Sequence, residues 1–264
     1  MNRNLPLLLL AVVSVTQLCC AGQGDAPREW GVELERGYTE KRGDELDAFL
    51  DDWLKHSSPS PAEFLDRKPE FEQAVYHIYQ AFFQPAEFYK DTKYILIQDK
   101  VDVYIVDSDF RGLKDVESWK SVDFVHKAPV ISQIQVRQFR PSITFPKRKI
   151  LYVQDDYFAS MLGFITQGND SYAMLDRYAQ EECVSEERTT RLKYLNSRLK
   201  IIPGHWGTGW HFETHPRIIA VYFSADLKHA VVSYRQYYGG GEAIMNATQN
   251  GQWRLVARKN TWVE

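Results

Sequence analysis

Three of the seven histidines lie close together in the segment 204–216, which reads Gly-His-Trp-Gly-Thr-Gly-Trp-His-Phe-Glu-Thr-His-Pro. They are His205, His211 and His215, and Glu213 lies between the last two. A histidine beside a carboxylate can act as a general acid or base near neutral pH, and both side chains bind metal ions. The cluster therefore raises three hypotheses: structural or surface histidines, the polar lining of a ligand pocket, and a metal site.

The spacing of these residues limits the metal hypothesis. If residues 210–215 form a strand, one face carries His211, Glu213 and His215, and the other carries Trp210, Phe212 and Thr214. Four residues span ~13 Å along a strand, so one zinc ion, with Zn–N bonds of ~2.0–2.1 Å, cannot readily bind both histidines. Glu213 could chelate with either histidine, but no zincin or Cys-x-x-Cys spacing occurs. We expect no metal and no cofactor.

Other reactive or ligand-binding residue types have simpler interpretations. Trp206 and Trp210 flank two glycines and could stack on a flat ligand, although aromatic residues are more often part of a core or its rim. Residues 239–241 are three glycines that precede an expected strand, which favours a bulge or a bend over a phosphate-binding loop. Cys183 lies among four glutamates, whose charge disfavours a thiolate, so it is a poor nucleophile. No catalytic residue can be assigned. The expected site consists of His205, Trp206, Trp210, His211, Glu213 and His215.

The first 21 residues have the features of a secretory signal peptide: one positive charge, a short apolar run and small residues at its end. The run is shorter than the ~20 residues that span a membrane. Cleavage after Ala21 would release a free protein. Alternatively, Cys19 or Cys20 would carry a lipid, although the residues before them fit a lipobox poorly. We expect a secreted, periplasmic or outer-surface protein that touches a membrane only through such an anchor.

The composition of the 264-residue chain is that of a globular protein, with 44% hydrophobic and 14% aromatic residues. The formal net charge is -3, and loss of the leader with Arg3 changes it to -3 - 1 = -4. A chain without a basic excess lacks the electrostatic basis for nucleic-acid binding. The expected partner is therefore a small molecule or a protein, and the oligomeric state stays open.

The elements that must position these residues are helices and antiparallel strands, so the predicted fold class is α+β. Residues 22–43 have the composition of a polar linker. The segment 44–153 predicts helices over 44–55 and 69–83, then strands over 94–98 and 101–106 joined as a hairpin, and further strands over 122–125, 130–139 and 150–153. The segment 155–264 predicts helices over 155–164, 171–178 and 185–198, then strands over 218–223, 230–237, 243–247 and 253–262. The two segments could be tandem helix-plus-sheet units or one interleaved domain.

The order of helices followed by a curved antiparallel meander, with the last turn Asn-Gly-Gln-Trp-Arg-Leu at 250–255, resembles the NTF2-like, cystatin-like cone proteins. The resemblance covers about the last hundred residues. The stretches 191–195, 204–207 and 261–264 are also similar to those of uncharacterised secreted bacterial proteins. The first resemblance implies a cone-shaped fold that can host isomerases, dehydratases, ligand carriers or interaction modules, so it does not choose a function.

We therefore expect a non-catalytic module that binds a ligand or a partner outside the cytoplasm. One alternative is an NTF2-like isomerase, dehydratase or hydrolase that uses His211, Glu213 or His215. Another alternative is a structural component of the envelope. An enzyme would direct His211 and Glu213 into a cavity, a ligand carrier would have an apolar pocket lined by Trp and Tyr, and a structural protein would expose a large apolar patch.

Overall fold

A computed structural model describes residues 29–85, 89–114, 129–167, 186–203 and 210–263. The signal peptide and residues 22–28 of the expected linker lie outside the described residues. So do the predicted strand at 122–125, the predicted helix at 171–178, Cys183, His205 and Trp206.

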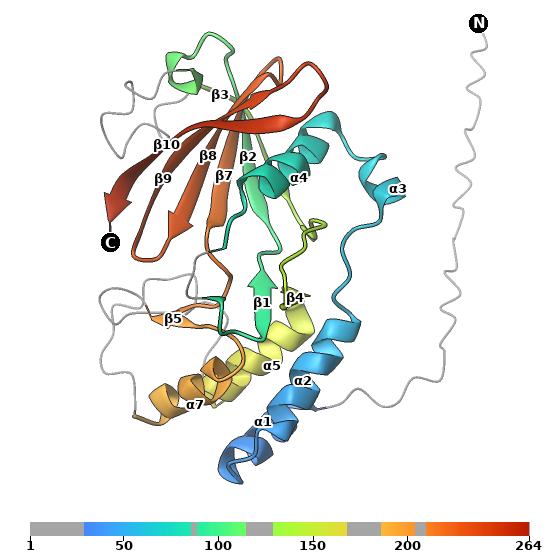
Figure 1. Ribbon diagram of the computed structural model, residues 1–264, viewed down its shortest axis with the longest axis vertical. Coiled ribbons are helices and arrows are strands. Elements are labelled where there is room, and N and C mark those ends of the chain that lie inside the picture. The colour runs from blue at the N-terminus through green and yellow to red at the C-terminus, as the bar shows by residue number, and fades with distance from the viewer. Residues whose placement is uncertain (1–28, 86–88, 115–128, 168–185, 204–209, 264) are drawn as a thin grey trace, which may run out of the picture.

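The upper part of the molecule in Figure 1 is a six-stranded sheet in the order β10-β9-β8-β7-β2-β3. Its strands are β2 (Val101–Val106), β3 (Val130–Val136), β7 (Arg217–Ser224), β8 (His229–Gln236), β9 (Gly239–Ala247) and β10 (Trp253–Val263). Strands β7 to β10 form the antiparallel meander predicted from the sequence, whereas β2 and β7 pair in parallel. A parallel pair inside the sheet makes it mixed.

Helix α4 (Glu70–Phe82) lies across one face of this sheet (Figure 1). Its apolar stripe packs on alternate residues of the strands, because side chains of a strand alternate between faces. The rings of Tyr76 and Tyr79 lie 4.7 and 5.0 Å from that of Phe139, which follows β3. All three are buried, so α4 and the segment after β3 are held together by aromatic packing.

The lower part of Figure 1 has its own core, in which helices surround a two-stranded parallel sheet. The helices are α1 (Trp30–Thr39), α2 (Asp44–Lys55), α5 (Asp155–Thr166) and α7 (Glu186–Asn196), and the strands are β1 (Tyr94–Ile97) and β4 (Lys149–Tyr152). Shorter elements are α3 (Ala62–Leu65), η2 (Arg111–Leu113) and the strand pair β5 (Ile202–Pro203) and β6 (Trp210–His211).

The linker prediction is wrong for the residues that form α1. Trp30 and Leu34 are buried in the lower core, and Tyr38 packs against it. These three residues recur every four positions and so form an apolar helical stripe. The many charged residues around them make this stripe hard to recognise in the sequence. Helix α1 is therefore part of the fold.

The hairpin predicted for residues 94–106 is also wrong. All four residues of β1 are buried in the interior, and β1 pairs with β4 instead of β2. The chain passes from β1 through a bend at Asp99 into β2. Gln98 holds this connection, because its side-chain amide donates to the carbonyl of Ile218 and accepts from its N–H, at 2.7 and 2.8 Å. This long-range bond replaces the turn that Asp99 and Lys100 suggested.

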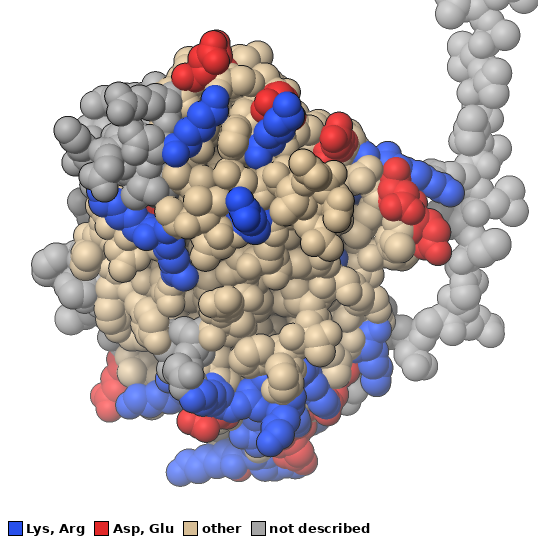
Figure 2. Space-filling view, turned by 45° about the horizontal axis from the view of Figure 1, so that its top comes forward, with Lys and Arg blue, Asp and Glu red and all other residues tan. Residues whose placement is uncertain are grey.

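The architecture is α+β, and strands from both halves of the sequence share the large sheet. Among the described residues, no helix combines the length and the apolar character needed to cross a bilayer. Figure 2 shows that charged side chains gather along the rim and the lower end of one face, whereas its middle carries few charges.

Candidate functional site

The expected strand through His215 is shorter in the structure than predicted. Strand β6 ends at His211, and the chain then bends. The side chain of Phe212 enters the lower core, where its ring meets that of Phe158 edge-on at 5.7 Å. The backbone N–H of Thr214 donates to the carbonyl of Leu96 at 2.8 Å. These contacts pull the segment out of an extended course.

The bend overturns the argument that kept the two histidines apart. The ring centroids of His211 and His215 lie 5.5 Å from each other, far closer than a straight strand would place them. Even so, no group of three or more His, Cys, Asp or Glu side chains suited to a metal ion occurs in the described parts of the chain.

His215 is fully buried and is held in one protonation state. The backbone N–H of Tyr237 donates to its Nδ1 at 2.8 Å, so the neutral ring carries its proton on Nε2. That Nε2 is buried without a hydrogen-bond partner among the described residues. Burial, followed by the charge of His211, lowers the pKa of His215 to about 3. The ring is therefore neutral near pH 7 and cannot serve there as a general acid or base with a matched pKa.

Besides His211, the charged residues around His215 are two arginines and one glutamate. Arg217 and Arg235 are directly opposite each other on β7 and β8. Arg235 Nη1 lies 3.3 Å from His211 Nδ1, and Arg217 Nη1 lies 3.8 Å from Glu213 Oε1. Burial of Glu213 raises its pKa, but the charge of Arg217, a backbone hydrogen bond and the histidines outweigh it. The pKa of Glu213 therefore lies below its usual value, and the carboxylate stays ionised.

This cluster joins the two cores. The backbone N–H of His215 donates to the hydroxyl of Tyr89 at 3.0 Å, in the connection between α4 and β1. The bond from Thr214 to Leu96 and the paired bonds between Gln98 and Ile218 lie on either side of it. His211 and Glu213 are partly buried, and neither borders on the two grooves described next. Trp210 is half-buried and packs against the lower core.

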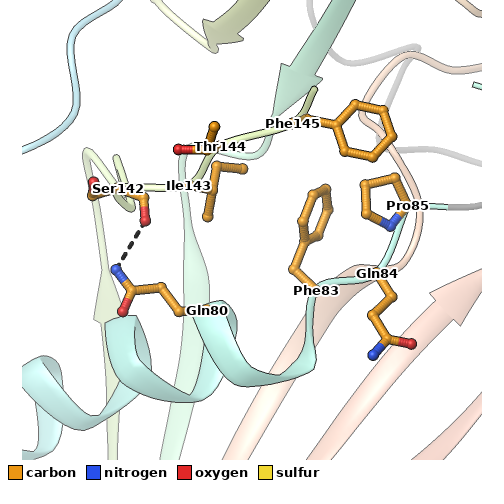
Figure 3. Close-up of a pocket in the computed structure, with 8 residues that line it drawn as sticks. All are labelled: Gln80, Phe83, Gln84, Pro85, Ser142, Ile143, Thr144 and Phe145. Atoms are coloured by element: carbon orange, nitrogen blue, oxygen red, sulfur yellow. Dashed lines mark hydrogen bonds between the residues drawn. The ribbon is translucent and has the colours of Figure 1, made fainter. Parts of the chain in front are cut away.

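An open groove of about 640 Å³ lies between the end of α4 and the segment that follows β3 (Figure 3). Its lining holds no charged residue. It consists of Gln80, Phe83, Gln84, Pro85, Ser142, Ile143, Thr144 and Phe145. At one end of the groove the rings of Phe83, Pro85 and Phe145 lie together, and at the other Gln80 Nε2 donates to the carbonyl of Ser142 at 2.9 Å.

One wall of the groove is fixed by aromatic stacking. The other contains backbone N–H groups that have no backbone acceptor among the described residues. Phe83 stacks on the buried Tyr79 at 5.0 Å, which fixes the α4 side. In the opposite wall, Ile143 points toward α4 and Thr144 points away from it (Figure 3). The backbone N–H groups of residues 142–145 donate to no backbone acceptor among the described residues. This short segment belongs to no strand, but, as in an edge strand, its N–H groups are available for pairing with another chain.

A second open groove, of about 710 Å³, lies between the end of α1 and helix α7. Its lining is charged and aromatic, in contrast to the first. It consists of Glu35, Tyr38, Thr39, Lys41, Arg42, Gly43, Glu187, Thr190, Lys193, Tyr194, Ser197 and Arg198.

Sequence reasoning found the cluster and missed both grooves. Residues 142–145 and 80–85 contain no charged residue and match no motif, and the bond between Gln80 and Ser142 joins positions 62 residues apart. The aromatic pair Phe82-Phe83 followed by Gln84-Pro85, just past a helix end, was the one available signal.

Comparison with the known protein families, with characterised proteins and with solved structures finds no match to this chain.

Proposed function

We propose that this protein is a non-catalytic binding module that works outside the cytoplasm and takes an extended, uncharged peptide segment of a partner in the groove beside α4. The observation that carries the proposal is the groove itself: about 640 Å³, open, uncharged and bordered by backbone N–H groups that have no backbone acceptor among the described residues. An extended peptide can pair with such a segment by strand addition, while pockets take alternate side chains.

The chemistry of the lining supports an uncharged partner. A charged side chain would lose hydration in the groove without meeting an opposite charge, since none of its eight residues is ionisable. Within the described parts of the chain, the side-chain amide of Gln84 and the hydroxyls of Ser142 and Thr144 form no hydrogen bond, so they are available to a peptide backbone. Phe83 and Phe145 offer an apolar contact for one side chain of the partner.

The burial of the His/Glu cluster also supports a binding role over a catalytic one. His215 is fully buried with a pKa of about 3, and Glu213 is engaged by the charge of Arg217. A catalytic pair needs access to substrate and a pKa close to the working pH.

The NTF2-like cone remains part of the proposal. Helix α4 lying across the antiparallel meander β7 to β10 supports it. The parallel pairing of β2 with β7 departs from the all-antiparallel sheet that the resemblance implies.

The proposal is tested by NMR titration of the ¹⁵N-labelled protein with a pool of acetylated, amidated hexapeptides built from Val, Thr, Gln, Ala and Phe. We expect saturable shifts of the backbone amides of residues 142–145 and of the side-chain amides of Gln80 and Gln84. Phe145→Ser should weaken binding at least about fivefold, because it removes an aromatic anchor.

The matched control is Phe64→Ser, since Phe64 is 47% exposed on α3 and does not line the groove. Equal binding by both variants would contradict the assignment to this groove. If neutral oligosaccharides shift these amide signals and the peptides do not, the proposal of a peptide ligand is contradicted and a sugar is identified as the ligand class.

A further inference from the structure

The second groove, between α1 and α7, contains more positive charge than its carboxylates neutralise. Four of its lining residues are cationic and two, Glu35 and Glu187, are anionic. Both glutamates are already engaged by Arg191, whose Nη2 lies 2.7 Å from Glu35 and whose Nε lies 3.0 Å from Glu187. Arg191 is itself buried, and as a single cation it neutralises one of these two negative charges within the fold.

Two of the four cations are also neutralised by carboxylates outside the groove. Arg42 is 2.6 Å from Asp44, and Arg198 is 3.1 Å from Asp47. The remaining two, Lys41 and Lys193, are exposed and have no carboxylate within ion-pair distance among the described residues. One lysine belongs to the turn after α1 and the other to α7, so each of the two elements that border the groove contributes one cationic residue.

The backbone at Lys41 gives a second, independent observation. Its φ of 55° lies in the left-handed region, at the position after a helix where glycine is usual. The N–H of Arg42 donates to the carbonyl of Gly37 at 2.8 Å, which closes the turn that demands this conformation. This closed turn fixes the backbone from which the side chain of Lys41, a lining residue of the groove, extends.

We propose that this groove is an anion site in which Lys41 and Lys193 bind one phosphate-type group, with Tyr38 and Tyr194 forming its aromatic wall. The hydroxyls of both tyrosines are already bonded inside the protein, to Thr190 at 2.9 Å and to the carbonyl of Arg42 at 2.8 Å. These hydroxyls are therefore not available to the anion, and the two lysines supply the charge. The site is separate from the groove beside α4.

A phosphate-type group could belong to a soluble ligand or to a lipid headgroup, so the experiment has two arms. In the first, the ¹⁵N-labelled protein is titrated with inorganic phosphate at constant ionic strength. In the second, it is sedimented with phosphatidylcholine vesicles that contain or lack phosphatidylglycerol. Saturable shifts of residues 39–43 and 190–198 with phosphate identify a soluble ligand, and sedimentation that requires phosphatidylglycerol identifies a headgroup.

The decisive variants are Lys41→Gly and Lys193→Gln. Each should weaken binding about tenfold, the loss expected for one charged hydrogen bond. Lys41→Gly should melt no lower than the unsubstituted protein, because glycine tolerates the left-handed conformation. Its weaker binding would then not be an effect of unfolding.

Lys147→Gly is the matched control, since Lys147 is also exposed, has a φ of 62° and lines neither groove. It should bind like the unsubstituted protein. The proposal is overturned if neither phosphate nor phosphatidylglycerol vesicles bind, or if the double variant Lys41→Gly, Lys193→Gln binds as tightly as the control.

Discussion

The cluster around His215 contains two histidines, a glutamate and two arginines, whereas the groove beside α4 contains no charged residue. The cluster is largely buried and connects two cores. The groove is open, and its backbone N–H groups at 142–145 have no backbone acceptor in the part of the chain that the structure describes. The residues with the richest chemistry are thus used by the fold. The uncharged residues of the groove are the ones that lie open to solvent.

The largest effect is expected in the buried cluster, where the titration of His215 should lower the stability of the protein in acid. The pKa of His215 is about 3 in the folded protein and 6.5 for the ordinary side chain. Below pH 6.5 the unfolded chain binds a proton that the folded chain does not, so stability falls as the pH drops from about 6.5 toward 3. At ~1.4 kcal/mol per pH unit, the loss of unfolding free energy from this group is roughly 3–4 kcal/mol by pH 4 and roughly 4–5 kcal/mol by pH 3. Urea unfolding between pH 7.5 and 4 measures it.

The variant His215→Gln removes the titrating ring and should flatten this pH dependence. Glu213, whose pKa is lowered, adds a smaller loss in the same direction only below about pH 4.5. An unchanged slope between pH 6.5 and 5 in the variant would show that His215 is not its source.

The second-largest effect is the loss of unfolding free energy when the buried ring of His215 is truncated. His215→Ala removes the acceptor for the N–H of Tyr237 and leaves a cavity, so we expect a loss of ~2–4 kcal/mol in unfolding free energy. His77→Ala is the control, because His77 is exposed on α4 and should change stability by at most ~0.5 kcal/mol. Similar losses for the two variants would contradict the structural role of His215.

The smallest effect on stability is expected in the groove. Gln80→Ala removes the bond to the carbonyl of Ser142, which is exposed to solvent, and should cost only ~0.5–1 kcal/mol. The free energy of peptide binding should fall by more than the unfolding free energy, because the variant lacks the hydrogen bond that joins the two walls of the groove. Gln133→Ala on β3 removes a similar exposed bond to Tyr104 and should leave binding unchanged. Equal binding by both variants would contradict the role of Gln80.

The sequence predicts the local elements well where one apolar period dominates. The strands at 218–223, 230–237 and 253–262 and the helices at 44–55 and 69–83 agree with β7, β8, β10, α2 and α4 within a few residues. It fails where distant contacts decide the pairing. The parallel pair of β1 with β4 and the bond between Gln98 and Ile218 join residues far apart in the chain, which no local pattern contains.

The candidate site is predicted less well than the fold for the same reason. The pattern of 210–215 indicates a strand, but Thr214 bonding to Leu96 and Phe212 entering the lower core bend it and bring His211 to His215. The groove beside α4 depends on contacts between distant segments: Tyr76 and Tyr79 pack on Phe139, and Gln80 bonds the carbonyl of Ser142.

The most direct test is hydrogen–deuterium exchange with and without the tightest-binding capped hexapeptide of the pool. If the open groove is the binding site, the peptide slows exchange in residues 80–85 and 142–145 and leaves residues 210–217 unchanged. Protection confined to residues 210–217 would contradict this and return the binding site to the His/Glu cluster.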